Sequence, residues 1–163
     1  MQPSVELRID EGIDRLLTRL KGLPADALYR EPQADEWPVM STLAHVVEML
    51  PYWAGQATLI ATKPGTPFGR THDDPGRLGA IAAHASDPVQ VVRISLQSCR
   101  EAALRALKAL PEAAWDVTGE HPARGTMSVR QVVDAFMVRH VEEHCAQVEA
   151  TLASLGYSPS QVP

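Results

Sequence analysis

The chain has 163 residues with a formal net charge of −5, 45% hydrophobic and 21% charged residues, which suits one domain, residues 1–163, with a full hydrophobic core. Lysine and arginine form no cluster, and no apolar run could span a bilayer, so we expect neither nucleic acid nor a membrane as partner. The N-terminal residues lack a basic-then-apolar signal pattern, and Cys99 and Cys145 form no CxxC unit, which predicts a reducing, cytoplasmic location.

Two helices are predicted in the first half of the chain from apolar residues that recur every three or four positions. The first runs from about Ser4, its expected N-cap, to Leu20. The second starts near Val39–Ser41 and ends at about Thr62. Pro51 lies inside the second helix and should kink it, because proline cannot donate the backbone hydrogen bond that the helix requires there.

Two further helices are predicted in the second half. The third should begin at Asp87-Pro88, a cap followed by a proline in the first turn, and continue to about Leu110. The fourth should begin at Ser128, where Gln131 three residues later predicts a capping box. It should end at Leu155-Gly156, because glycine commonly terminates helices.

The connections between these helices are long and rich in proline and glycine. They cover Gly22–Pro38, Pro64–Gly79 and Pro111–Met127, with a short helical turn expected at Gly79–Ala85. No segment shows sustained period-2 alternation, so we predict no sheet. Four helices with long connections predict an all-α fold, a four-helix bundle with crossover loops.

A pair of histidines, His140 and His144, lies in the last predicted helix. A spacing of four residues puts both imidazoles on one face, where they could hold one metal ion together. Six histidines in 163 residues give about 0.2 such pairs by chance, so the spacing alone is a weak signal. The pair also lies within an apolar stripe, formed by Val132, Val133, Phe136, Met137, Val141, Val148 and Leu155. The histidines are therefore either metal ligands or polar residues at the edge of the core that are satisfied by hydrogen bonds.

His45 is the best candidate for a third ligand. It lies in the second helix, which is apolar around most of its circumference and should be central in the bundle. Three imidazoles would leave a coordination position open, as in catalytic zinc sites. Glu48 follows His45 by three residues and is a candidate catalytic base or a carboxylate that orients the ligand; the alternative is a surface carboxylate.

Two polar residues close to the histidine pair have simple expected roles. Gln147 follows His144 by three residues and could hydrogen-bond a ligand or cap the pocket. Cys145 is turned about 100° away from His144, so we expect it to pack in the core and not to act as a nucleophile.

The loops carry the other candidates. His84 and His121 are expected to be solvated, as most loop histidines are. The group His72-Asp73-Asp74 is an alternative set of metal ligands. Arg70 and Arg77 either form salt bridges within their loop, Phe68–Arg77, or meet an anionic substrate.

Together these motifs resemble the DinB-like (YfiT-like) bacterial proteins. The run His140-Val-Glu-Glu-His144-Cys-Ala-Gln147 is similar to the family's closing signature, a His-x-x-x-His followed three residues later by Gln. The run Leu43-Ala-His45-Val-Val-Glu48, entered through Trp37, is similar to the family's first histidine motif. The order of helices, loops and motifs agrees over most of the chain.

The resemblance implies a bundle with uncommon crossover connectivity, often dimeric, so a homodimer is expected. It also implies a divalent metal, typically nickel or zinc, held by His45, His140 and His144. Family members include transferases and isomerases that use low-molecular-weight thiols, and proteins described as metal-dependent hydrolases.

Two functional hypotheses follow. The first is a metal-dependent enzyme that performs thiol-dependent S-transfer or hydrolysis on a small-molecule substrate, with nickel or zinc as cofactor and a low-molecular-weight thiol as a further one. The second is a non-catalytic helical bundle that binds a small ligand or a partner protein and uses its histidines structurally.

Overall fold

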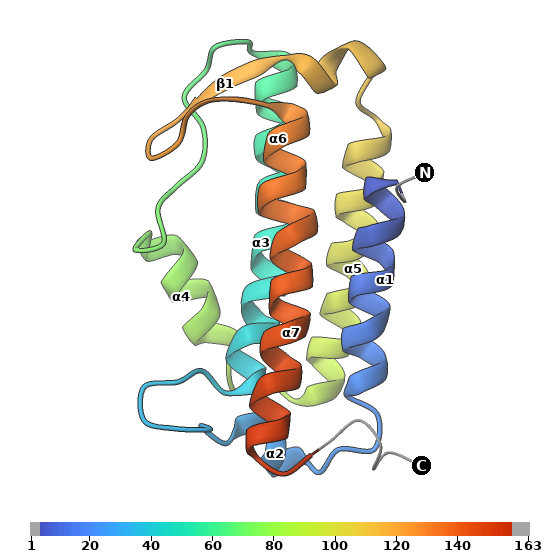
Figure 1. The fold of residues 1–163 in the computed structure, drawn as a ribbon, viewed down its shortest axis with the longest axis vertical. Helices are drawn as coiled ribbons and strands as arrows, with labels where there is room; N and C mark the ends of the chain where they lie inside the picture. Colours follow the sequence, from blue (N-terminus) through green and yellow to red (C-terminus); the bar gives the residue numbers. More distant parts are fainter. Residues whose placement is uncertain (1–3, 158–163) are drawn as a thin grey trace.

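The structure is a computed structural model that describes residues 4–157, and these residues form a helical bundle capped by a small hairpin (Figure 1). The elements in chain order are α1 (Val5–Arg19), α2 (Ala25–Tyr29), α3 (Val39–Thr62), α4 (Pro75–His84), α5 (Val89–Lys108), the 3-10 helix η1 (Glu112–Asp116), β1 (Thr118–His121), β2 (Gly125–Ser128), α6 (Val129–Val133), the π-helical segment η2 (Asp134–Val138) and α7 (Arg139–Ser154).

Four long rods make the bundle, which confirms the predicted fold class. They are α1, α3, α5 and the continuous rod of α6, η2 and α7 (Figure 1). Helix α3 is central, because it contacts α4, α5, α6 and α7, whereas α1 packs on α5 and α7. Each rod contributes fully buried side chains to one core, among them Ile13, Leu43, Leu96 and Met137.

The helix boundaries follow local capping chemistry. The Ser4 hydroxyl accepts a hydrogen bond from the Leu7 N–H, and Ser128 and Gln131 form the predicted capping box. Helix α3 continues through Pro51 without a break. Helix α5 begins one residue later than predicted, at Val89, and its N-cap is Pro88 and not Asp87.

The prediction of no sheet was also wrong. Strands β1 and β2 pair antiparallel, with Thr118 opposite Ser128 and His121 opposite Gly125. Sequence alternation did not reveal them because the buried positions of β1 are Gly119 and His121, which are not apolar residues. Strand β1 also contacts the loop before α4: the Phe68 N–H donates to the Glu120 carbonyl over 3.0 Å. The hairpin thus joins that loop to the end of the bundle.

Helix α4 replaces the short turn expected at Gly79–Ala85. It begins earlier, at Pro75, because the Asp74 carboxylate caps it by accepting from the Arg77 N–H over 2.9 Å. The helix lies outside the bundle against α3 (Figure 1). Among the helices of residues 4–157, none combines the length and apolar character that crossing a membrane requires.

Candidate metal centre

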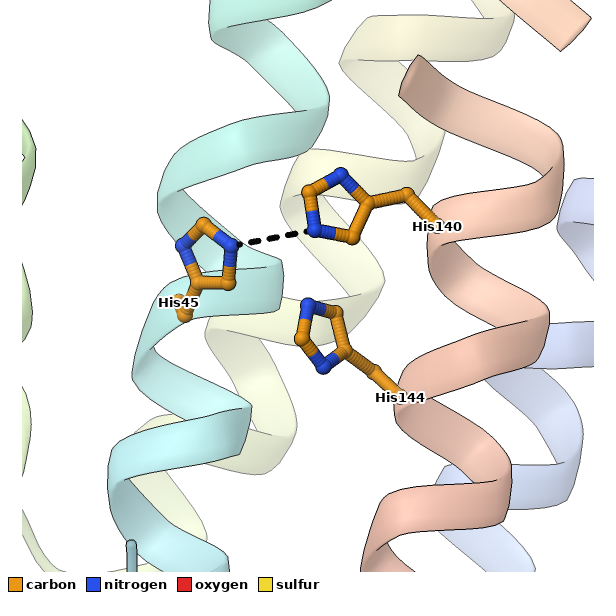
Figure 2. Close-up of side chains that lie close together, drawn as sticks. All are labelled: His45, His140 and His144. Atoms are coloured by element: carbon orange, nitrogen blue, oxygen red, sulfur yellow. Dashed lines mark hydrogen bonds between the residues drawn. The ribbon is translucent and has the colours of Figure 1, made fainter. Parts of the chain in front are cut away.

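The three predicted histidines meet between α3 and α7 (Figure 2). His45 comes from α3, and His140 and His144 come from successive turns of α7. Each offers one ring nitrogen, and these nitrogens all lie within 4.8 Å of one another. The Nε2 atoms of His45 and His140 are 3.4 Å apart. Two nitrogens bound to one ion at about 2.1 Å also lie about 3.4 Å apart at a tetrahedral angle, so this pair already has ligand spacing.

The local sequence explains how the rings come together. His140 and His144 share a face of α7 because four residues make slightly more than one helical turn. The π-helical segment η2, Asp134–Val138, leads directly into α7, and such segments are frequent at functional sites. His45 is only 1% exposed because α3 is surrounded by other helices.

The hydrogen bonding of His144 favours a metal ligand. Its Nδ1 donates to the Gln147 side-chain oxygen over 2.8 Å, which leaves Nε2 with a free lone pair. That Nε2 is buried and has no hydrogen-bond partner among the described residues. Leaving a buried polar atom unpaired is costly, and a cation between the three rings would satisfy it. Gln147 thus hydrogen-bonds a candidate ligand, which is one of the two roles predicted for it.

The electrostatics keep the pair neutral. Burial lowers the pKa of His140 to about 3, and the neighbouring His144 and His45 contribute to the same shift. Burial likewise lowers the pKa of His144 to about 4, against an opposing hydrogen bond to Gln147. Neutral imidazole is the form that binds metal ions, so both rings are in their metal-binding protonation state at pH 7.

Glu48 lies behind His45. Its Oε2 atom is 3.6 Å from His45 Nδ1, on the opposite side of the ring from Nε2. Arg70 donates a hydrogen bond to the other carboxylate oxygen, Oε1. Burial alone would raise the pKa of Glu48, but the interactions with His45 and Arg70 outweigh it and lower the pKa. This arrangement of carboxylate, histidine and candidate metal position favours an orienting role for Glu48 over a base.

A pocket of about 510 Å³ opens beside the cluster, with His45 and His140 in its wall. Its other walls come from the loop before α4, from α4 itself, from the hairpin and from Trp53 and Phe136. Those two aromatic rings stack with their centroids 4.1 Å apart. A small molecule in this pocket would lie directly against the histidines.

The prediction of a solvated His121 was wrong. The ring is 6% exposed and lies against Trp53, Phe68 and Phe136. Its Nδ1 accepts from the Ala123 N–H over 3.2 Å, so the ring proton is on Nε2, a buried atom without a partner in the described chain. Burial, followed by the charge of Arg124, lowers the pKa of His121. Because the ring also lines the pocket, it joins the candidate site.

The remaining candidates fall outside the cluster. The ring of His72 and the carboxylate of Asp73 are both largely exposed and lie 3.3 Å apart, and neither belongs to the three-histidine group. Cys145 packs in the core as predicted, with its thiol donating to the Gly12 carbonyl. Burial raises the pKa of Cys99 to about 12 and that of Cys145 to about 11.

Comparison with solved structures gives the same fold. YfiT from Bacillus subtilis, described as a probable metal-dependent hydrolase with an unusual four-helix bundle topology, superposes with a TM-score of 0.79 at 15% identity, over 97% of this chain and 95% of that one. The mycothiol-dependent maleylpyruvate isomerase gives a TM-score of 0.65 at 15% identity, over 99% of this chain. This chain covers only 65% of the isomerase.

The family comparison is more direct. No protein of curated function matches the sequence. The model of the DinB superfamily matches residues 8–148, which contain all three clustered histidines. The chain therefore belongs to the DinB superfamily.

Proposed function

We propose that this protein is a metal-dependent enzyme that binds one divalent ion, nickel or zinc, through His45, His140 and His144. The observation that carries the proposal is the buried, unpartnered Nε2 of His144, which lies with two other imidazoles beside an open pocket. A divalent ion held by three imidazoles keeps open positions and lowers the pKa of a water or thiol that binds there.

The chain's own residues prepare the site. Gln147 holds the proton of His144 on Nδ1, so that Nε2 faces the cluster as an acceptor. Glu48 lies in the corresponding place behind His45, with Oε2 3.6 Å from Nδ1 and not hydrogen-bonded to it, and Arg70 donates to its other carboxylate oxygen. The aromatic walls of the pocket exclude water from one side of a bound substrate.

The reaction proposed is thiol-dependent S-transfer or hydrolysis on a small molecule. A thiol would have to come from outside the chain, because Cys99 and Cys145 are both buried. The open pocket beside the histidines favours catalysis over a purely structural role for them. A homodimer, a cytoplasmic location and the lack of nucleic-acid and membrane partners stay predictions from the sequence.

Visible spectra of the nickel-loaded protein test the thiol reaction. N-acetylcysteine should produce sulfur-to-nickel charge-transfer bands and raise the melting temperature, whereas N-acetylserine, which lacks the thiol, should do neither. The His144→Ala variant should show no such bands. If no thiol changes the spectrum or the melting temperature of the wild type, S-transfer is wrong and hydrolysis becomes the proposal.

A further inference from the structure

The pocket beside the histidines is positively charged, although the chain as a whole carries a net charge of −5. Arg70, Arg77 and Arg124 line it, and Asp73 is the one carboxylate in the part of its wall that the structure describes. The three arginines come from three separate segments: the loop after α3, helix α4 and the turn between β1 and β2. The fold therefore brings cations that are distant in sequence to one cavity.

Each of these guanidinium groups lies over an aromatic ring. The guanidinium carbon is 3.7 Å from the ring centroid of Tyr52 for Arg70, 5.6 Å from that of Trp37 for Arg77, and 4.7 Å from that of Phe136 for Arg124. Stacking fixes the plane of a guanidinium and leaves the N–H groups at its edge free to bind a planar anion. The arginines are therefore held in defined orientations at the pocket wall.

Two of the three arginines lack an anionic partner. Arg70 already has two, because it forms an ion pair with Glu48 and lies 3.6 Å from Asp74. Arg77 donates to the His72 carbonyl over 2.8 Å, but no carboxylate of residues 4–157 lies within ion-pair distance of it. Arg124 likewise forms no ion pair within that part of the chain. Burial, followed by the charge of Arg70, lowers the pKa of Arg77 and outweighs the opposite effect of Glu48, Asp73 and Asp74.

We propose that Arg77 and Arg124 bind the substrate through an anionic oxygen group, a carboxylate or a phosphate, and hold it beside the three histidines. As a statement about the substrate this rests on the proposed metal-dependent function. The remaining body of the molecule would lie against Trp53 and Phe136, which also line the pocket. Guanidinium groups bind both kinds of oxyanion through paired charge-assisted hydrogen bonds, so binding must distinguish them.

Calorimetric titration of the metal-free protein tests this inference without any contribution from a metal. The probes are benzoate, phenyl phosphate and benzamide, the last being a neutral analogue of benzoate. At least one of the two anions should bind, and benzamide should not. Arg77→Gln and Arg124→Gln should each weaken anion binding at least tenfold, because each removes a charge-assisted contact.

Two further variants control for folding and for general charge. Arg105→Gln removes an exposed arginine of α5 and should bind like the wild type. Arg77→Lys keeps the charge and should recover part of the affinity that Arg77→Gln loses. The inference is overturned if neither anion binds the wild type, if benzamide binds as well as benzoate, or if the Arg77→Gln and Arg124→Gln variants bind like Arg105→Gln.

Failure here is separable from failure of the proposed function. If nickel binds at the histidines but the affinity for the anions does not depend on Arg77 and Arg124, the proposed anion site is wrong and the proposed metal site stands. If the affinity for the anions depends on both arginines but no metal binds, the metal-dependent function is wrong and the pocket remains an anion-binding site.

Discussion

The Nε2 atoms of His45 and His140 lie 3.4 Å apart across the contact between α3 and α7. Helix α3 contributes one ring, and α7 contributes this partner and His144, so a shared ion would join the two helices. The carboxylate of Glu48 and the amide of Gln147 lie on the outer sides of His45 and His144.

Glu48→Gln should weaken metal binding about tenfold or more, because outer partners of metal-bound histidines typically contribute this much. Gln keeps the shape of Glu48 but removes the charge facing His45 Nδ1 and Arg70. Competition with a chromophoric chelator measures the affinity. A purely catalytic base would behave differently, leaving metal affinity as in the wild type, and that result would reject the orienting role.

Gln147→Ala should also weaken metal binding by about 10- to 100-fold, since the acceptor that holds the His144 proton on Nδ1 is lost. Gln97→Ala is the matched control, because Gln97 is exposed on α5, away from the cluster. The same chelator assay applies to both. Equal affinities for the two variants would show that the hydrogen bond to Gln147 does not prepare the ligand.

The metal-free protein should lose stability as the pH falls from 7.5 to 5. Burial lowers the pKa values of His140 and His144 to about 3 and about 4. Below pH 6.5 these two residues therefore bind protons in the unfolded chain and stay neutral in the folded one. At pH 5 the expected loss is about 2 kcal/mol for each histidine.

Urea denaturation at a series of pH values measures this loss. The His140→Ala/His144→Ala variant should show a much flatter dependence, with a remainder from His121, whose pKa burial also lowers. If the free energy of unfolding falls equally with pH in both proteins, the two histidines are not held neutral by the fold.

Gly119→Ala should separate the hairpin from the loop before α4. A Cβ at this position would lie 2.8 Å from the Thr66 carbonyl oxygen and 2.9 Å from the Phe68 ring. The expected destabilisation is about 1–3 kcal/mol. Gly55→Ala is the control, because nothing lies within 4 Å of its Cβ, and in a helix it should stabilise by about 0.5–1 kcal/mol. Thermal denaturation compares them, and equal melting temperatures would contradict this packing.

The sequence predicts most of the fold because its long helices carry both a 3.6-residue apolar period and recognisable caps. Ser4 and Ser128 cap α1 and α6 as their sequence contexts indicate. The pair His140 and His144 was recognisable for the same reason, since a helix puts residues four apart on one face. His45 was grouped with them because it lies in the helix expected to be central and in a run similar to the family's first histidine motif. That the three rings meet is visible only in the bundle, because a contact between α3 and α7 leaves no local pattern in either helix.

What the sequence did not predict depends on contacts between distant segments. Strand β1 buries Gly119 and His121, so its alternation has no apolar signal. The π-helical segment before α7 is a shift in backbone hydrogen bonding that no residue type there specifies. His121 and Arg124 reach the pocket only because the hairpin folds over the end of the bundle. The best available signal for these pocket residues was the presence of arginines and histidines in the connections Pro64–Gly79 and Pro111–Met127.

Metal content of protein purified without an affinity tag and dialysed against nickel or zinc tests the three-histidine site most directly. We predict about one ion per chain for the wild type and for the His72→Ala/His84→Ala variant, which removes two exposed histidines. The His140→Ala/His144→Ala variant should retain almost none. An equally low metal content in the wild type and in the His140→Ala/His144→Ala variant would contradict the metal site.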